Sequence, residues 1–349
     1  MGSRQSVFLQ DMEEIIHDSQ IPWQKLCHKT VMVTGATGLI GQTLVNALLH
    51  RSAVFTEDIT VAALVRNMEK AEKLFSSWLH EKTGLKLIQG SIENVPAIAD
   101  PIDYVIHCAC PTESAYFISH PVDTIHTIIA GTQNILELAR RKSVEGVIFL
   151  SSMEVYGKIE TEQLLSEDML GTVDPMSPRS CYPLGKRLAE NLCCGYWAQY
   201  QVPVVICRLA QTFGPGVQAD DKRVFAYMAR CAQAGADIEL ATAGMKKNMY
   251  LYTADAVTAI LTLLLCGEPA TVYNAANPET YCSVKEMAQA VVDRFGHGNM
   301  AVKTMVGADA STKYPPDGFL RLDTSRLQKL GWTPSVGLME MYERMMSAF

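Results

Sequence analysis

The sequence predicts an α/β protein built around a doubly wound parallel sheet. Short apolar runs of strand length alternate with amphipathic segments of helix length along most of the chain. A glycine-rich turn joins the first of these runs to the first long amphipathic segment. Of the 349 residues, 48% are hydrophobic and 19% are charged, which supplies a large core and excludes a disordered chain.

The expected elements follow one another from the N-terminus. A helical segment is expected over residues 5–27, where apolar side chains recur at helical spacing. These side chains are Val7, Phe8, Met12, Ile15 and Ile16. Apolar runs bounded by polar residues or glycine predict strands at 30–33, 59–65, 86–89, 104–108, 146–150 and 204–207. Longer amphipathic segments predict helices from the glycine turn to about His50, over 121–141, where a proline opens the segment, and over 182–199.

The alternation divides the chain into regions. We expect a helical extension over residues 1–28 and a dinucleotide-binding domain over 29–207, to which residues 249–278 return. Residues 208–248 and 279–349 break the alternation, and we assign them to a smaller substrate-binding lobe. Ligands bind at the carboxyl edge of such sheets, so this edge is where the lobe is expected to lie.

Composition excludes several classes of protein. The net charge of −7 gives no reason to expect a nucleic-acid partner, and no apolar run approaches the ~18 residues that span a membrane. The ten cysteines form no C-x-x-C pair and the eight histidines show no metal-ligand spacing, so we expect reduced thiols and no metal. The first residues carry early acids and no secretory apolar core, which predicts a cytoplasmic protein.

The glycine-rich turn is the first candidate site. Gly35, Gly38 and Gly41 follow the first strand directly and open the first long helix. Glycine allows the tight turn, the approach of a pyrophosphate to the backbone, and close packing of helix on sheet. The helix N-terminus then offers free N–H groups to the phosphates. The turn therefore predicts a dinucleotide site; the alternative is a glycine-rich turn without a ligand.

The choice of dinucleotide depends on the end of the second strand. An acid at that point would bind the ribose hydroxyls of NAD, but the chain has Arg66 there. Arg66 would pair with the 2′-phosphate of NADP or stack on adenine. From these residues alone, NADP through Arg66 stays open beside NAD.

A tyrosine and a lysine one helical turn apart form the second candidate site. Tyr182 and Lys186 share one face of the expected helix at 182–199. The ammonium of Lys186 is expected to lower the pKa of Tyr182 from ~10, so that its hydroxyl becomes a base for a substrate alcohol. Ser152, at the end of the fifth strand, is expected to hydrogen-bond the same substrate oxygen.

Together these features resemble the extended short-chain dehydrogenase/reductase family, and within it the nucleotide-sugar epimerases, dehydratases and decarboxylases. The supporting strings are TGATGLIG, DYVIHCAC, FLSSMEVYG, PRSCYPLGKRLAE, RLAQTFGP and LGWTP. The resemblance implies a Rossmann-type domain with a smaller C-terminal lobe, tightly held NAD, oxidation of a sugar at C4, and a homodimer paired through the helix of Tyr182 and its neighbour. It assigns cofactor contacts, besides the three glycines, Arg66, Tyr182 and Lys186, to Thr37, Leu39, Ile40, Ser91, Ile92, Cys108, Ala109, Cys110 and Ser151.

The local likeness is greatest to UDP-glucuronate decarboxylases. It rests on the strings at 152–157 and 178–190, on the acidic-basic loop ending at Arg223, and on Pro111 after the fourth strand. Glu154 would then assist at C5 of the sugar once C4 is a ketone. Dehydratases of the family carry an Asp-Glu pair where this chain has Met153 and Glu154, and a methionine cannot protonate a leaving hydroxyl.

The substrate-facing positions depart from the pattern of the decarboxylases. Asn248 stands where they carry an arginine, Gln211 replaces a phosphate-side asparagine, and Ser91 replaces an adenine-contacting aspartate. Arg321 matches a position that usually contacts the nucleotide diphosphate. We assign substrate binding to Pro111, Gln211, Arg223, Asn248 and Arg321.

These observations predict an NAD-dependent enzyme that acts on a nucleotide-diphosphate sugar through a 4-keto intermediate. Decarboxylation of UDP-glucuronate is the first reading, 4-epimerisation the second and 4,6-dehydration the third. An NADP-dependent sugar or carbonyl reductase is an alternative, as is a non-enzymatic dinucleotide-binding regulator.

Overall fold

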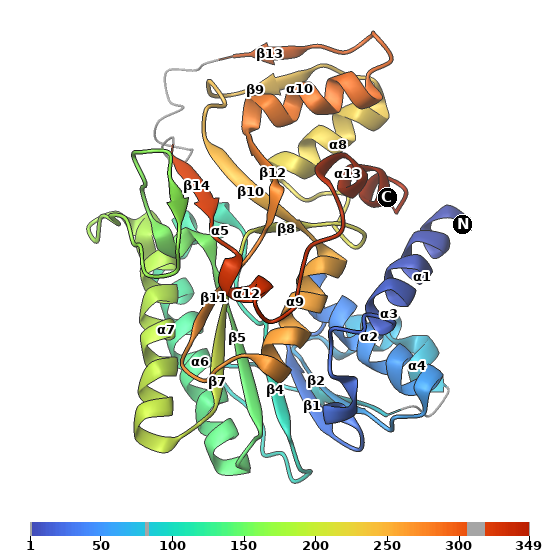
Figure 1. Cartoon of the computed structure of the whole chain (residues 1–349), viewed down its shortest axis with the longest axis vertical. Helices are drawn as coiled ribbons and strands as arrows, with labels where there is room; N and C mark the ends of the chain where they lie inside the picture. The colour runs from blue at the N-terminus through green and yellow to red at the C-terminus, as the bar shows by residue number, and fades with distance from the viewer. Residues whose placement is uncertain (1, 81–83, 306–317, 349) are drawn as a thin grey trace.

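A parallel sheet of seven strands forms the centre of the molecule (Figure 1). The computed structural model describes residues 2–80, 84–305 and 318–348. The strand order is β11-β7-β5-β4-β1-β2-β3, and every neighbouring pair is parallel. The strands are β1 (Thr30–Thr34), β2 (Thr60–Val65), β3 (Leu85–Gln89), β4 (Tyr104–His107), β5 (Gly146–Ser152), β7 (Val204–Leu209) and β11 (Val272–Ala275). The order of connection reverses between β1 and β4, the point at which doubly wound sheets bind their ligands.

Helices cover both faces of this sheet. Successive strand residues point to opposite faces, so Val31 and Val33 pack with α2 and α9, whereas Met32 packs with α6 and α7. These helices are α2 (Leu39–Phe55), α6 (Pro121–Lys142), α7 (Cys181–Tyr200) and α9 (Thr253–Cys266). Shorter helices are α3 (Met68–Leu74), α4 (Ser76–His80) and α5 (Ser114–Ser119). The inner strands are buried on both sides, which explains their nearly continuous apolar sequences, whereas the edge strand β3 leaves Lys86 and Gln89 exposed.

The predicted fold class is confirmed, and the six predicted strands and three long helices are present with shifted ends. The helix after the glycine turn continues to Phe55, beyond the predicted end. The predicted helical segment at 5–27 is two elements, α1 (Gly2–Ile16) and the 3-10 helix η1 (Trp23–Leu26). Between them the Asp18 side chain accepts a hydrogen bond from the Gln20 N–H at 2.9 Å, and Pro22 disfavours helix for the residue before it.

A second group of elements lies at one end of the central sheet (Figure 1). Its main sheet has the order β12-β10-β14-β6, with β8 paired to β10, and a further pair joins β13 to β9. Strand β8 begins two residues after β7 ends, which places this lobe beyond the carboxyl ends of the central strands. The strands are β6 (Leu164–Leu165), β8 (Gln211–Phe213), β9 (Ile238–Leu240), β10 (Lys247–Tyr252), β12 (Asn277–Ser283), β13 (Val302–Thr304) and β14 (Phe319–Leu322). The helices are α8 (Val224–Ala234), α10 (Val284–Phe295), α12 (Ser325–Gln328) and α13 (Leu338–Met346), and the 3-10 helices η2 (Met153–Tyr156) and η3 (Pro178–Ser180) lie between β5 and α7.

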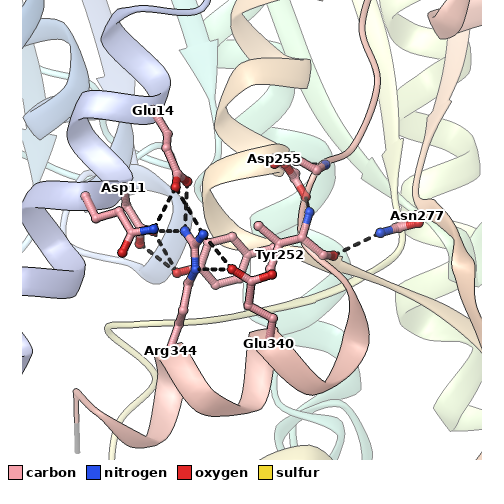
Figure 2. A network of polar contacts seen from close by, with 10 residues as sticks. Asp11, Glu14, Tyr252, Asp255, Asn277, Glu340 and Arg344 are labelled. Atoms are coloured by element: carbon pink, nitrogen blue, oxygen red, sulfur yellow. Dashed lines mark hydrogen bonds and ion pairs between the residues drawn. The ribbon is translucent and has the colours of Figure 1, made fainter.

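The first helix is tied to this lobe by a buried polar network around Arg344 of α13 (Figure 2). Its guanidinium lies 2.9 Å from Asp11 and 2.7 Å from Glu14, both in α1, and 2.7 Å from Glu340. The Tyr252 hydroxyl at the end of β10 donates to Asp11 at 2.7 Å. The network therefore joins α1, the lobe sheet and α13.

Asp11 in this network gives a testable pH dependence. Burial raises the pKa of Asp11 from 3.8 to about 6, despite the opposing hydrogen bonds from Tyr252 and Arg344. Between pH 4 and pH 6 the folded chain therefore binds more protons than the unfolded chain, so this group lowers the free energy of unfolding as the pH rises. About two pKa units correspond to about 2–3 kcal/mol. The measurement is urea denaturation of wild type and of Asp11→Asn at pH 4 and at pH 7. We expect the stability advantage of wild type over Asp11→Asn to be about 2 kcal/mol smaller at pH 7 than at pH 4.

A matched control for this experiment is Glu72→Gln on the exposed face of α3. Its difference from wild type is expected to stay constant over the same pH range. A constant difference for Asp11→Asn as well would contradict the assignment.

Two further features of the described residues bear on chemistry. All ten cysteines are free thiols, and no three His, Cys, Asp or Glu side chains of the described part are grouped to hold a metal ion. None of the helices within residues 2–80, 84–305 and 318–348 combines the length and apolarity of a membrane span.

Candidate active site

The glycine turn after β1 has no room for side chains. Gly35 has φ +66°, and a Cβ there would lie 2.9 Å from the Ala109 backbone. A Cβ on Gly41 would lie 2.2 Å from the Gly35 carbonyl oxygen, so the first turn of α2 packs directly on the loop. Gly38 is the N-cap of α2, and no described side chain caps this end. The close packing and the uncapped N–H groups fit a dinucleotide pyrophosphate.

A buried histidine holds the neighbouring loop against this turn. The Thr34 hydroxyl accepts a hydrogen bond from the Ala109 N–H at 3.1 Å and lies 2.8 Å from His107 Nδ1. Burial, with a contribution from Lys186, lowers the pKa of His107 to about 3, so the ring is neutral. His107 Nε2 lies 3.3 Å from the Thr132 hydroxyl. This network places residues 108–110 beside Gly35.

The residues predicted for the adenosine end lie beyond β2 and β3. Arg66 is exposed where β2 ends, and its charge acts on Glu93. Ile92 is buried against Gly131, and Asn134 Nδ2 donates to the Ile92 carbonyl at 3.0 Å. Ser91 accepts the Asn94 N–H at 3.1 Å. The sequence analysis assigned no role to Glu93, although its carboxylate interacts electrostatically with Arg66.

The structure brings Ser152, Tyr182 and Lys186 together. Ser152 ends β5, and Tyr182 lies in the first turn of α7. The Ser152 side chain is near enough to the Tyr182 hydroxyl to lower its pKa. Lys186 Nζ lies 5.9 Å from the centre of the Tyr182 ring and donates to the Leu150 carbonyl at 2.6 Å. Because β5 and α7 pack against each other, residues thirty positions apart meet at one point.

The predicted lowering of the Tyr182 pKa is wrong for the protein without ligands. Burial raises the pKa of Tyr182 well above 10, and the charges of Cys110 and Glu154 raise it further. The hydrogen bond with Ser152 and the charge of Arg179 act in the opposite direction. Helical spacing correctly placed Lys186 near the ring, but it gave no measure of the burial that dominates the pKa.

Glu154 is held by an arginine to which the sequence analysis assigned no role. Arg179 Nη2 lies 2.9 Å and 3.2 Å from the two carboxylate oxygens and 3.3 Å from the Ser114 hydroxyl. The Arg179 guanidinium is 5.0 Å from the centre of the Phe117 ring, which stacks on Tyr182 with centroids 4.4 Å apart. The one signal in the sequence for a role of Arg179 in the site was its position three residues before Tyr182.

Ser151, predicted to contact the cofactor, has its hydroxyl engaged elsewhere. It is buried and donates to Glu190 at 2.5 Å, and Glu190 in turn pairs with the buried Arg208. Adjacent strand residues point to opposite sides, so Ser151 and Ser152 do not share a site. The contact of Ser151 with the cofactor stays a prediction, in which the side-chain hydroxyl is already bonded to Glu190.

The predicted substrate residues differ in their access to solvent. Pro111 and Gln211 are half-buried, Arg321 is exposed 5.6 Å from the centre of the Tyr281 ring, and Arg223 pairs with Asp221 at 2.5 Å.

Asn248 is buried in the lobe. It is 5% exposed, and its Oδ1 has no hydrogen-bond partner among the described residues. It lies on β10 two residues from Tyr250, whose buried ring packs on Phe213. Asn248 therefore lies buried in β10 with a side-chain oxygen free to accept a hydrogen bond, and substrate binding by this residue stays a prediction.

The reversed strand order, the uncapped glycine turn and the Ser–Tyr–Lys group at the same edge define a dinucleotide-dependent enzyme of the short-chain dehydrogenase/reductase type. The sequence profile of the NAD dependent epimerase/dehydratase family matches residues 31–276. The chain belongs to this family, and NAD is its cofactor.

Relatives and solved structures agree with this assignment. The chain is 30% identical over 318 residues to UDP-glucuronic acid decarboxylase 6 of Arabidopsis thaliana, covering 89% of this chain and 85% of the relative. It is 29% identical to UDP-glucuronic acid decarboxylase 1 of Xenopus tropicalis, covering 89% and 70%. The fold is similar to UDP-glucuronic acid 4-epimerase of Bacillus cereus, with a TM-score of 0.75, 22% identity and coverage of 91% and 98%. It is also similar to dTDP-glucose 4,6-dehydratase of Streptomyces venezuelae, with a TM-score of 0.73, 20% identity and coverage of 91% and 95%.

Proposed function

We propose that the protein converts a nucleoside-diphosphate sugar through a 4-keto intermediate, and that its reaction is the decarboxylation of UDP-glucuronate. The full-length similarity to UDP-glucuronic acid decarboxylases supports this substrate class. The observation that carries the proposal is that Ser152 and Glu154, at the end of β5 and in η2, both act on the pKa of Tyr182 in the first turn of α7.

Each of these side chains has a separate task. Tyr182 takes the proton from the C4 hydroxyl, and Ser152 holds the same oxygen through a hydrogen bond. Lys186, which donates to the Leu150 carbonyl, keeps a positive charge near the Tyr182 ring and binds the cofactor ribose. The chemistry that bound NAD supplies is acceptance of a hydride from C4. Residues 35–41 and 108–110 would hold it.

Glu154 acts after C4 has become a ketone. The ketone makes the bonds at C5 labile, and Glu154 transfers protons at C5 or orients the sugar. Met153 offers no acid beside it, which disfavours 4,6-dehydration.

A second candidate reaction is 4-epimerisation. Decarboxylases of the family carry an arginine at the position of Asn248. In this chain that position holds an uncharged side chain that is buried, and this difference favours epimerisation over decarboxylation. Epimerisation needs only Ser152, Tyr182 and Lys186 and enough space for the 4-keto sugar to rotate in the site.

The same proposal covers the nucleotide end and the assembly. We assign Pro111, Gln211, Arg223 and Arg321 to the substrate, with residues 29–207 and 249–278 as the dinucleotide domain and 208–248 and 279–349 as the lobe. A homodimer through α6 and α7 is supported by exposed apolar side chains on both helices, including Val122 and Leu188. The ten free thiols are consistent with the cytoplasm.

The test is incubation of the purified protein with UDP-, dTDP-, CDP- and GDP-sugars. Mass spectrometry detects loss of carbon dioxide or water, and NMR detects epimers of unchanged mass. Loss of carbon dioxide from UDP-glucuronate is the expected result. An epimer without mass loss would select the second candidate, and unchanged sugars throughout would overturn both.

A further inference from the structure

An ion pair and a ring stack lie beside the Tyr182 hydroxyl. Arg179 Nη2 contacts both oxygens of Glu154, and the Arg179 guanidinium faces the ring of Phe117. The Phe117 and Tyr182 rings are nearly parallel, at 12°. Phe117 is 1% exposed and Tyr182 is 7% exposed, so the stack is closely packed.

The ion pair joins the two segments that deliver the reacting groups. Glu154 lies in η2, directly after Ser152, and Arg179 lies in η3, directly before α7 and Tyr182. The side chains of the pair remain 25% and 32% exposed, so the pair is accessible at the site rather than enclosed in the core. A purely structural arginine is available for comparison. Arg187 in α7 donates to the Val155 and Gly171 carbonyls at 2.7 Å and 2.8 Å, and neither of these two residues is a predicted site residue.

We propose that Arg179 is a positioning residue for the reaction, fixing the Glu154 carboxylate beside the Tyr182 hydroxyl and balancing its charge there. The inference rests on the proposed function, because it assigns Tyr182 as the base and Glu154 as the assisting carboxylate. Arg179 thus provides, from η3, a positive charge next to Glu154, whereas the position of the decarboxylase arginine on β10 holds the uncharged, buried Asn248.

The electrostatics agree with this geometry. The groups that act on Tyr182 are Cys110 after β4, Glu154 in η2, Arg179 in η3 and Lys186 in α7. Glu154 raises the pKa of Tyr182 and Arg179 lowers it, so the two charges oppose each other at the base. Removing Arg179 leaves the Glu154 charge unbalanced and makes the base harder to form.

The test compares Arg179→Met, Arg179→Lys, Glu154→Gln and the double variant Arg179→Met/Glu154→Gln with wild type. The substrate is the nucleotide sugar that the wild type converts in the panel above. We expect Arg179→Met to lower kcat at least about 10-fold with a smaller change in KM, and to move the acid limb of kcat/KM up by about one pH unit. Glu154→Gln should move the acid limb of kcat/KM to lower pH, and the double variant should return it toward the wild-type position. Arg179→Lys should keep the acid limb near the wild-type position and give an intermediate kcat.

A second readout does not need turnover. NMR of ring-labelled tyrosine, with the Tyr182 signal identified by its loss in Tyr182→Phe, follows the same pKa in each variant. The control Arg187→Met should lower the unfolding temperature without moving either pH readout.

An acid limb and a Tyr182 signal that stay in place in both Arg179→Met and Glu154→Gln would overturn the proposal, even if kcat falls. If Arg179→Met does not fold, Glu154→Gln and Arg179→Lys decide the outcome in the same way. Failure of the proposed function is separate, because the wild type itself would then convert no sugar while the NMR titration still tests the ion pair.

Discussion

Replacing Tyr182 with phenylalanine is expected to lower kcat by about 10³-fold while the protein still folds and binds NAD. The substitution removes one hydroxyl and keeps the ring that stacks on Phe117. General acid–base groups contribute about 10²–10⁴-fold to a rate, and this hydroxyl lies in the first turn of α7 within reach of the charges of Glu154 and Arg179. Turnover of the nucleotide sugar gives kcat, and calorimetric titration gives the affinity for NAD.

The matched control is Tyr200→Phe at the other end of α7. Tyr200 is 45% exposed, and its hydroxyl accepts a hydrogen bond from the neighbouring Gln199 at 2.9 Å. Loss of this hydroxyl is therefore expected to leave kcat within about 2-fold of wild type. Equal activity of Tyr182→Phe and Tyr200→Phe would show that Tyr182 is not the base.

The second large effect is expected on stability, at the buried ion pair of Arg208 and Glu190. Arg208 in β7 binds both carboxylate oxygens of Glu190 in α7, at 2.9 Å and 2.7 Å, and the side chains are 4% and 9% exposed. Arg208→Met leaves the Glu190 charge buried without its cation. Breaking such a pair costs about 3–5 kcal/mol, so we expect a loss of this size in the free energy of unfolding, measured by urea denaturation.

Two comparisons make this result specific. Arg140→Met breaks an exposed pair with Glu137 and is expected to cost less than about 1 kcal/mol. Arg208→Met/Glu190→Met removes both charges, and its loss is expected to be smaller than that of Arg208→Met alone. A loss below about 1 kcal/mol in Arg208→Met would contradict the structural role of the pair.

The sequence was sufficient for the sheet and for the meeting of the reacting groups because both depend on local pattern and strand order. Apolar runs predicted the central strands, and the parallel arrangement then brings the end of β5 next to the start of α7. Ser152 and Tyr182 had to lie at the same edge once those elements were placed.

The sequence was insufficient where the direction of a side chain decides its contacts. Ser151 and Asn248 are on strands, where neighbouring positions face opposite sides, and the sequence did not show that both side chains are buried. Arg179 and Phe117 lie in short elements that no periodicity predicts, so their contacts with Glu154 and Tyr182 required the coordinates. The Tyr182 pKa depends on burial, which spacing along a helix does not reveal.

The pairing of Asp11 with Arg344 has a consequence for the order of folding. The two residues are 333 positions apart in the sequence, so their contact is among the most non-local of the structure. Non-local contacts require the closure of long loops, which slows their formation. We expect α1 and α13 to dock late in folding, after the central sheet has formed.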